Sequence, residues 1–132
     1  MKIMKLQGTE KMLYELVAPL VMCPAILRQN NNYPFKTSRN HIWYVALHDM
    51  SVVGFIPIKK GSSHYSIDNY FVSGDNSSIL GELLSEVIKD LSSLSSLVAV
   101  VHKRHVMVFA QKGFQTCIEW KNYDKMQYLP EV

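Results

Sequence analysis

Residues 72–81 (VSGDNSSILG) leave a predicted strand and enter a strongly predicted helix. The first turn of a helix presents unpaired backbone N–H groups and the positive end of the helix dipole, so a phosphate group can bind there. Asp, Asn and Ser are also the residues that cap any helix start. The segment therefore predicts either a phosphate site or an ordinary capped helix, and the residues alone leave both open.

A second cluster is basic, because residues 102–105 read His-Lys-Arg-His. Such a run can contact a ligand phosphate or a nucleic acid, but a charge cluster at a strand-to-helix turn is more often only solvated. His102 and His105 are weak evidence for zinc without a third ligand at a recognisable spacing, so we predict no metal site. Cys23 and Cys117 form no CxxC pair, and we expect both to be small buried side chains.

Composition restricts the class of protein that carries these clusters. Of 132 residues, 48% are hydrophobic and 19% are charged, and the formal net charge is +3. This excludes intrinsic disorder and predicts a single domain over residues 1–132 with a sizeable core. The charge is far from the dense Lys/Arg stripe of a nucleic-acid binder. No apolar run is long enough for a membrane span, and the first residues lack a signal-peptide segment, so we expect a cytoplasmic protein.

Hydrophobic spacing predicts the elements that position the clusters. Residues 78–91 place apolar side chains at i, i+3, i+4, i+7 and i+8, which is typical of a helix. Further helices are predicted over residues 10–21, a short turn after Pro24, and residues 103–112. Strands are predicted over residues 3–6, 41–48, 52–58, 64–72, 97–101, 114–120 and 123–129. The polar residues 29–40 (QNNNYPFKTSRN) predict a long loop, a length that is often functional.

The order of these elements predicts an α+β fold. Strand 64–72, helix 78–91 and strand 97–101 form a crossover, so we expect these two strands to be parallel. The earlier strands form an antiparallel meander, with Pro57 indicating an edge strand or a bulge. Alternation along 64–72 places Ile67 and Phe71 on one face and Asp68 and Val72 on the other.

Several motifs, taken in this order, resemble the GNAT superfamily of acyl-CoA-dependent N-acyltransferases over residues 9–129. Residues 43–46 (WYVA) and 53–55 (VGF) resemble its hydrophobic hairpin. Residues 70–72 with the loop into the helix resemble its pyrophosphate motif, and residues 109–114 (FAQKGF) resemble its YxxxGF motif. The resemblance implies a mixed, mostly antiparallel sheet with one parallel strand–helix–strand crossover and flanking helices.

The resemblance also implies acetyl-CoA, or another acyl-CoA, as the cofactor. Backbone groups of Phe71 and Val72 would pair with its pantetheine arm. Its pyrophosphate would be held by the amides of Asn76, Ser77, Ser78, Ile79, Leu80 and Gly81. Two departures stand out: only the second glycine of the family's GxG is matched, by Gly81, and Asp75 and Glu82 add negative charge that opposes a pyrophosphate.

The resemblance implies a base and an acid near the thioester. Amine acylation needs a group that accepts a proton from an ammonium, and the candidate bases are Asp68 and His105. The alternatives are that Asp68 is an ordinary solvated strand residue and that His105 is a surface helix residue. Phe109 stands where the family often has a tyrosine that protonates the leaving thiolate, and phenylalanine cannot donate a proton.

We therefore expect a small N-acyltransferase that transfers an acyl group to an amine of a small molecule or a protein. The acceptor is expected near residues 29–40 and the N-terminal helices. One alternative is a non-catalytic, GNAT-shaped module that binds CoA or regulates, which Phe109 and the degenerate loop favour. Another is a weak nucleic-acid binder that uses Lys59, Lys60, Lys103 and Arg104. The oligomeric state stays open.

Overall fold

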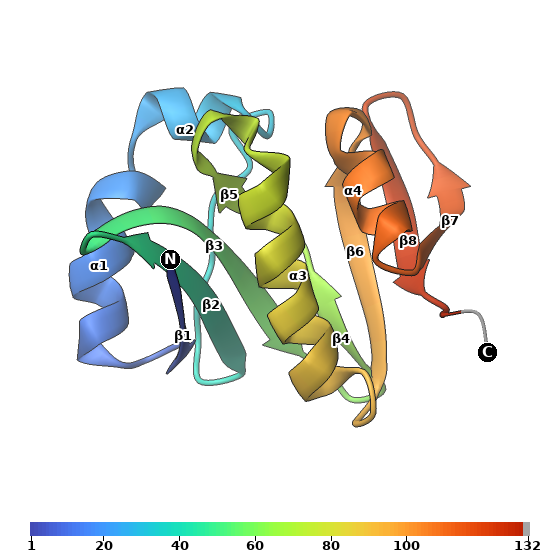
Figure 1. Cartoon of the computed structure of the whole chain (residues 1–132), viewed down its shortest axis with the longest axis horizontal. Coiled ribbons are helices and arrows are strands. Elements are labelled where there is room, and N and C mark those ends of the chain that lie inside the picture. The colour runs from blue at the N-terminus through green and yellow to red at the C-terminus, as the bar shows by residue number, and fades with distance from the viewer. Residues whose placement is uncertain (131–132) are drawn as a thin grey trace.

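The computed structural model describes residues 1–130, which form one eight-stranded sheet with helices packed against it (Figure 1). The strands are β1 (Lys2–Gln7), β2 (His41–His48), β3 (Ser51–Lys60), β4 (His64–Ile67), β5 (Phe71–Val72), β6 (Ser96–His102), β7 (Phe114–Glu119) and β8 (Tyr123–Tyr128). The helices are α1 (Lys11–Val21), α2 (Pro24–Arg28), α3 (Ser77–Leu91) and α4 (Val106–Gln111), with 3-10 turns η1 (Ser73–Asp75) and η2 (Lys103–His105).

The sheet is mixed, and its strand order is β1-β2-β3-β4-β6-β8-β7 with β5 paired to β3. The pair β4–β6 is parallel, and the other pairs are antiparallel. Helix α3 provides the crossover that leads to β6 (Figure 1). The predicted α+β class, with its one parallel crossover, is confirmed. Residues 29–40, between α2 and β2, contain no helix or strand, as predicted.

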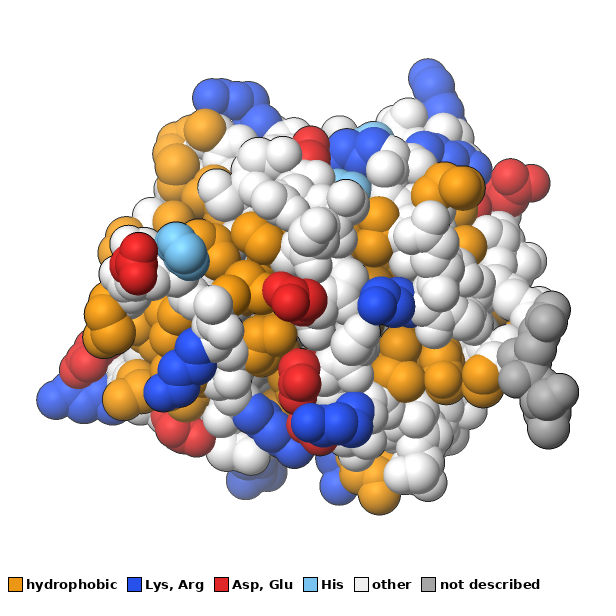
Figure 2. All heavy atoms as spheres, viewed as in Figure 1, with side chains coloured by type: hydrophobic (Ala, Val, Ile, Leu, Met, Phe, Trp, Pro, Cys, Tyr) orange, Lys and Arg blue, Asp and Glu red, His pale blue; other side chains and the backbone are white. Residues whose placement is uncertain are grey.

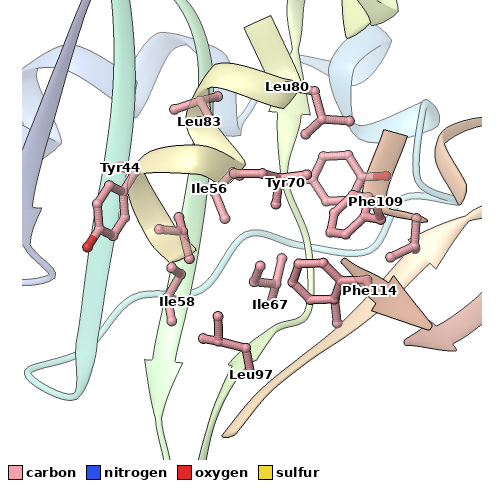
Figure 3. Packing of buried hydrophobic residues seen from close by; sticks show 14 of the residues in the cluster. Tyr44, Ile56, Ile58, Ile67, Tyr70, Leu80, Leu83, Leu97, Phe109 and Phe114 are labelled. Carbon is pink, nitrogen blue, oxygen red and sulfur yellow. The ribbon is translucent and has the colours of Figure 1, made fainter. Parts of the chain in front are cut away.

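Two apolar clusters lie on opposite faces of the sheet. Alternate residues of β2, such as Tyr44 and Ala46, pack with the buried face of α3 (Figure 3). The intervening Trp43 and Val45 pack with α1, whose buried residues include Leu13. This alternation is the period of two that a strand imposes on its side chains, and it places α3 and α1 on different faces.

The predicted strand 64–72 is interrupted, and this changes which side chains share a face. Residues 68–70 separate β4 from β5. As a result, Ile67 and Val72 belong to the same buried cluster, whereas Phe71 belongs to the other. The prediction that Ile67 and Phe71 share a face was wrong, because a local irregularity shifts every later side chain to the opposite face.

Of the two alternatives for Pro57, the edge strand was wrong, since β3 is an interior strand with neighbours on both sides. The irregularity in the β2–β3 pairing lies at residues 52–54, opposite Ala46 and Leu47, and not at Pro57. On one side β3 pairs with β2 along its length. On the other side it pairs with β5 at Gly54 and Phe55 and with β4 at Lys59 and Lys60, so Pro57 lies in the interval between them. The N–H groups of a strand alternate in direction, and Lys60 N–H donates toward Asn40 O on the β2 side. The missing N–H of Pro57 would therefore point away from β2, into the interval where neither β4 nor β5 pairs with β3. The proline thus removes no hydrogen bond from the sheet.

The surface corrects one further expectation. Cys117 is exposed and Cys23 is only partly buried, so the prediction that both are buried was wrong. Cys117 lies in β7, where only the first residue of the strand is buried. Within residues 1–130, no helix is long and apolar enough to cross a membrane.

Candidate functional site

Strands β5 and β6 diverge, and this creates a gap in the sheet. The last parallel pair between β4 and β6 is Ile67 with Ala99. Beyond it, β5 pairs only with β3, and the remainder of β6 pairs only with β8. Phe71 and Val72, the residues predicted to pair with pantetheine, thus form one edge of this gap, although their side chains are buried. Their side chains face the two cores, so only backbone groups of β5 are directed along the gap.

At the upper end of the gap in Figure 1, α3 begins with a capped first turn. Asn76 Oδ1 accepts from the backbone N–H of Ser78 at 3.0 Å and of Ile79 at 3.1 Å. Two of the amides that were predicted to hold a pyrophosphate therefore already have an acceptor. Of the six predicted residues, the first three are exposed, Ile79 is half-buried, and Leu80 and Gly81 are buried. The capped-helix alternative thus describes this turn as it stands.

Gly81 lies against the end of α4. A Cβ at Gly81 would come 3.4 Å from Lys112 Cε and 3.9 Å from Lys112 Nζ. Lys112 Nζ also donates to Ser85 Oγ at 2.9 Å. Lys112 thus adds a positive charge beside the first turns of α3. This proximity could not be predicted from the sequence, because Lys112 lies far along the chain from Gly81.

Asp75, at the end of η1, makes two contacts with η2, the turn that follows β6. Its backbone φ is 52°, in the left-handed region that short polar residues tolerate. One oxygen, Asp75 Oδ1, accepts from Arg104 Nε at 3.1 Å and lies 3.1 Å from His105 Nε2. Asp75 is half exposed, whereas His105 is 3% exposed. The alternative that His105 is a surface helix residue was wrong, because its ring is buried between Tyr70 and Asp75.

His105 continues this contact into the core. Its Nδ1 lies 2.6 Å from the Tyr70 hydroxyl, and both residues are buried. Burial, with the nearby positive charge of Arg104, lowers the pKa of His105 despite the raising effect of Asp75. Burial raises the pKa of the Tyr70 hydroxyl. Both groups are therefore neutral near pH 7, and the structure brings together Asp75, His105 and Tyr70 in one chain of contacts.

Phe109 lies beside this chain. Its ring is 0% exposed, and its centroid is 5.6 Å from that of Tyr70 and 5.2 Å from that of Phe114 (Figure 3). Position 109, where the family often has a proton donor, thus holds a core side chain that contacts Tyr70, a residue just before β5. Sequence reasoning missed Tyr70 because nothing in residues 70–72 indicates that His105, 35 residues later, lies against its hydroxyl.

A cavity of about 340 Å³ lies beside the interruption at residues 68–70. Its walls combine tyrosines, asparagines, one valine and one carboxylate: Asn30, Asn31, Tyr33, Asp68, Asn69, Val100 and Tyr123. This volume is at the lower end of the range for small-molecule sites. The cavity lies where β4 and β6 part, since Asp68 and Asn69 come from the interruption and Val100 follows the last β4–β6 pair. The loop 29–40 supplies part of the wall through Asn30, Asn31 and Tyr33.

The inner wall of this cavity is ordered by hydrogen bonds between asparagines. Asn30 Nδ2 donates to Asn69 Oδ1 at 2.6 Å and to Tyr70 O at 3.1 Å. Asn69 Nδ2 donates to Tyr33 O at 2.9 Å, which ties the loop to the interruption. Asn30 Oδ1 is buried without a hydrogen-bond partner among the described residues. A buried acceptor left unpaired costs about 1–3 kcal/mol, so a donor that reached it would be stabilised.

Asp68 is exposed and belongs to neither strand, and it also borders two smaller adjoining cavities. The expectation that it shares a face with Val72 was wrong, because the interruption reverses the alternation at that point. Within residues 1–130, Asp68 and His105 share no hydrogen bond or ion pair, so the two candidate bases are not brought together. In the same range no three His, Cys, Asp or Glu side chains gather in a way that could hold a metal ion.

The cations of the nucleic-acid alternative are dispersed. Lys103 pairs with Asp124 and, at 3.6 Å, with Glu119, while Arg104 pairs with Asp75. Figure 2 shows basic and acidic side chains scattered over the α3 face, with no continuous basic stripe. A phosphate-backbone binder needs such a stripe, so these contacts give that alternative no support.

Comparisons with known proteins rest on structure. No protein-family model and no curated protein sequence matches the chain. Escherichia coli ElaA is 11% identical, with a TM-score of 0.78, and the match covers 96% of this chain and 99% of that one. An acyl-CoA N-acyltransferase from Pseudomonas aeruginosa is 12% identical, with a TM-score of 0.71 and coverage of 96% and 99%. A GNAT family acetyltransferase from Elizabethkingia anophelis, with acetyl-CoA bound, is 15% identical, with a TM-score of 0.63 and coverage of 99% and 97%.

These matches extend over nearly the whole of each chain, so the likeness includes the order of the elements and not only one motif. The open mixed sheet, the crossover through α3 and the divergence of β5 from β6 are parts of one architecture. The chain has the fold of the GNAT superfamily.

Proposed function

We propose that this chain, as one domain over residues 1–132, transfers an acyl group from an acyl-CoA to an amine. The observation that carries the proposal is the gap between β5 and β6, which opens next to the cavity lined by Asp68 and Asn69. A thioester donor and an amine acceptor must meet within bonding distance, and a gap that joins a cavity provides such a meeting point. Several proteins of this fold are named as acetyltransferases, which supports the same reaction class.

The residues present fit an acyl-CoA in two respects. Free backbone edges of β5 and β6 suit an extended arm that carries amide groups, as pantetheine does. Near the start of α3, Arg104 and Lys112 supply positive charge for phosphate groups, whereas Asp75 and Glu82 oppose them with two negative charges. When bound, an acyl-CoA supplies a thioester, which is a carbonyl activated for attack by an amine.

On the acceptor side, Asp68 is the residue that we assign to the amine. Its carboxylate attracts an ammonium group and accepts a proton from it, while the exposed position leaves the carboxylate accessible from the cavity. Tyr33, Tyr123 and Val100 provide apolar walls for the stem that carries the amine. The size of the cavity suits a small-molecule amine or a single lysine side chain.

The test combines donor binding with transfer. Thermal unfolding is measured with acetyl-CoA and, as a control, with ADP, which lacks the thioester and the pantetheine arm. A ligand at 100 times its Kd stabilises a protein by about 2.7 kcal/mol, so acetyl-CoA is expected to raise the Tm clearly more than ADP does. Equal shifts with both compounds would contradict binding in the gap.

Transfer is then followed by mass spectrometry of acylated products over a panel of amines and lysine peptides. Asp68→Asn is expected to slow transfer by about 10²–10⁴-fold while the acetyl-CoA shift stays unchanged. Asp49→Asn is the matched control, because Asp49 lies in the exposed β2–β3 turn. Full activity of Asp68→Asn would remove Asp68 from the reaction.

A non-catalytic acyl-CoA-binding module is the second candidate. Two observations favour it: Phe109 is a closed core residue, and Asn76 already caps the amides at the start of α3. The same experiment separates the two candidates. A clear acetyl-CoA shift without any acylated product, over the whole panel, would select the module.

A further inference from the structure

Charges of opposite sign border the cavities that meet at Asp68. The cavity of about 340 Å³ adjoins a smaller one of about 150 Å³, and Tyr33, Asp68 and Asn69 line both. Asn69 Nδ2 donates to Tyr33 O at 2.9 Å, so this shared wall is ordered. The smaller cavity adds Lys36 and Lys59 to its lining. One carboxylate and two ammonium groups thus border the same pair of adjoining cavities.

The two lysines come from different elements that the fold brings together. Lys59, near the end of β3, pairs with His41 of β2 and with Ser66 of β4. Directly opposite residues of neighbouring strands point to the same face, and all three line the smaller cavity. Lys36 lies in the loop 29–40, where its Nζ is 5.5 Å from the centroid of the Tyr33 ring. The attraction between this cation and the ring keeps Lys36 beside a residue that lines both cavities.

The three charges remain available to a ligand. Within residues 1–130, Asp68, Lys36 and Lys59 take part in no ion pair. His41 adds no charge near pH 7, because burial and the positive charge of Lys59 lower its pKa despite the raising effect of Asp68. Charges of opposite sign that do not neutralise each other are complementary to a ligand that carries both signs.

The arrangement of the cavities decides how the two charges of this ligand are connected. Asp68 borders both cavities, so the ammonium that it attracts stands between them. A carboxylate on the neighbouring carbon then reaches the smaller cavity, where lysines supply charge-assisted hydrogen bonds. The remaining substituent of that carbon enters the larger cavity, whose walls include Tyr33, Val100 and Tyr123. A carbon that carries an ammonium, a carboxylate and an apolar side chain is that of an α-amino acid.

We propose that the acceptor is an α-amino acid with an apolar or aromatic side chain, bound through Asp68 and through Lys36 and Lys59; this inference rests on the proposed function. Transfer joins the acyl carbon to the nitrogen and breaks the C–S bond. The ammonium loses two protons, one to solvent through Asp68 and one to the departing sulfur. The N-acyl product keeps its carboxylate but has no ammonium, so its attraction to Asp68 is lost and the product leaves the site.

Two substrates that differ only in the carboxylate test this assignment. L-Phenylalanine carries the carboxylate and phenethylamine lacks it, and kcat and KM are measured for both at saturating acetyl-CoA. The double variant Lys36→Gln/Lys59→Gln is expected to raise the KM for phenylalanine by about tenfold, with kcat within about twofold of the wild type. Its KM for phenethylamine is expected not to rise, because that amine has no carboxylate for the lysines to bind. Comparing variant with wild type for each substrate cancels the difference in reactivity between the two amines.

Lys60→Gln is the matched control, since it removes the same charge from the neighbouring residue. Lys59 shares a face of β3 with Phe55, which packs on the α1 side, whereas Lys60 shares the opposite face with Ile58 of the α3 cluster. Lys125→Gln tests the third cavity, which Asp68 also borders and to which Lys125 contributes. Both single variants are expected to keep the wild-type KM for phenylalanine.

A second readout does not depend on turnover. In ¹H–¹⁵N NMR spectra of the wild-type protein, L-phenylalanine is expected to shift the backbone amide signals of residues 36 and 59, and phenethylamine is expected to leave them in place. The double variant is expected to lose this response to phenylalanine.

Three results would overturn the proposal. A double variant with the wild-type KM for phenylalanine removes the role of the lysines while acyl transfer itself stands. A tenfold rise in this KM for Lys125→Gln instead assigns the carboxylate to the third cavity. A wild-type protein that acylates phenethylamine but not phenylalanine excludes the amino acid as acceptor. If no amine is acylated at all, the proposed function fails, and the NMR signals of residues 36 and 59 then decide separately whether the amino-acid site exists.

Discussion

Phe109→Tyr adds one hydroxyl at the position where the sequence led us to look for a proton donor. In an open site, this added hydroxyl would change the free energy of unfolding by about 1 kcal/mol or less. The structure shows that the site is closed: Phe109 is 0% exposed and lies between the rings of Tyr70 and Phe114. The new hydroxyl therefore has to enter a packed core.

Two costs follow from this packing. Overfilling a well-packed core costs about 1–3 kcal/mol, and a buried hydroxyl without a partner costs about 1–3 kcal/mol. Allowing for partial relaxation, the free energy of unfolding is expected to fall by about 2–4 kcal/mol. For a chain of this length, each kcal/mol corresponds to about 3–5 °C, so the Tm is expected to fall by about 6–20 °C. No gain in transfer rate is expected, because the new hydroxyl would be enclosed in the core beside Tyr70 and Phe114, where no substrate reaches it.

Urea denaturation and thermal unfolding of the variant and the wild type measure this difference. Phe35→Tyr is the control, since Phe35 is only partly buried and meets Phe55 edge-on at 5.0 Å, so its hydroxyl can reach water. A Phe109→Tyr protein that unfolds within about 2 °C of the wild type would refute the reasoning. It would mean that the core beside Tyr70 has room for a hydroxyl, as an open site would.

Three other predictions follow from contacts of the same region. Asp75→Asn removes a negative charge near the expected phosphates, and because Asp75 is half exposed, solvent screening limits the gain in binding free energy to about 1 kcal/mol. Calorimetry should therefore show acetyl-CoA binding about fivefold tighter, and weaker binding would place the phosphates elsewhere. Asn76→Ala removes the cap of α3 and should lower the free energy of unfolding, measured by urea denaturation, by about 1 kcal/mol. Asn76→Asp keeps the acceptor and should lower it clearly less. Equal losses would exclude capping as the cause. Burial lowers the pKa of His41, His102 and His105 below 6.5 in the folded state, so as the pH falls through about 6.5 the unfolded chain binds protons first and stability decreases. The Tm should accordingly fall between pH 7.5 and 5, less so in His105→Gln, and an increase over that range would contradict it.

Local periodicity was enough to predict most elements. Helix α3 and strand β2 were found within one residue of their bounds, because each carries a repeating apolar pattern over several turns or pairs. The crossover through α3 fixed the parallel pair β4–β6, since the handedness and length of such a connection leave few alternatives. The loop before α3 was also predicted from its Asp, Asn and Ser residues. Its cap at Asn76 and its charge at Asp75 are equally compatible with an ordinary capped helix that binds no phosphate.

The arrangement of the site depends on contacts between distant residues, which a local pattern does not contain. The interruption at residues 68–70 reverses the alternation of side chains, and this one change moves Tyr70 into the α3 core and leaves Asp68 at a cavity. His105 appears in the sequence as one member of a basic run, yet η2 buries it against a tyrosine 35 residues earlier. Phe109 became a closed core residue for the same reason, because the depth of a side chain is set by what packs over it from other elements. Residue types and spacing therefore determined the elements and their order, whereas only tertiary packing decided which side chains could act together.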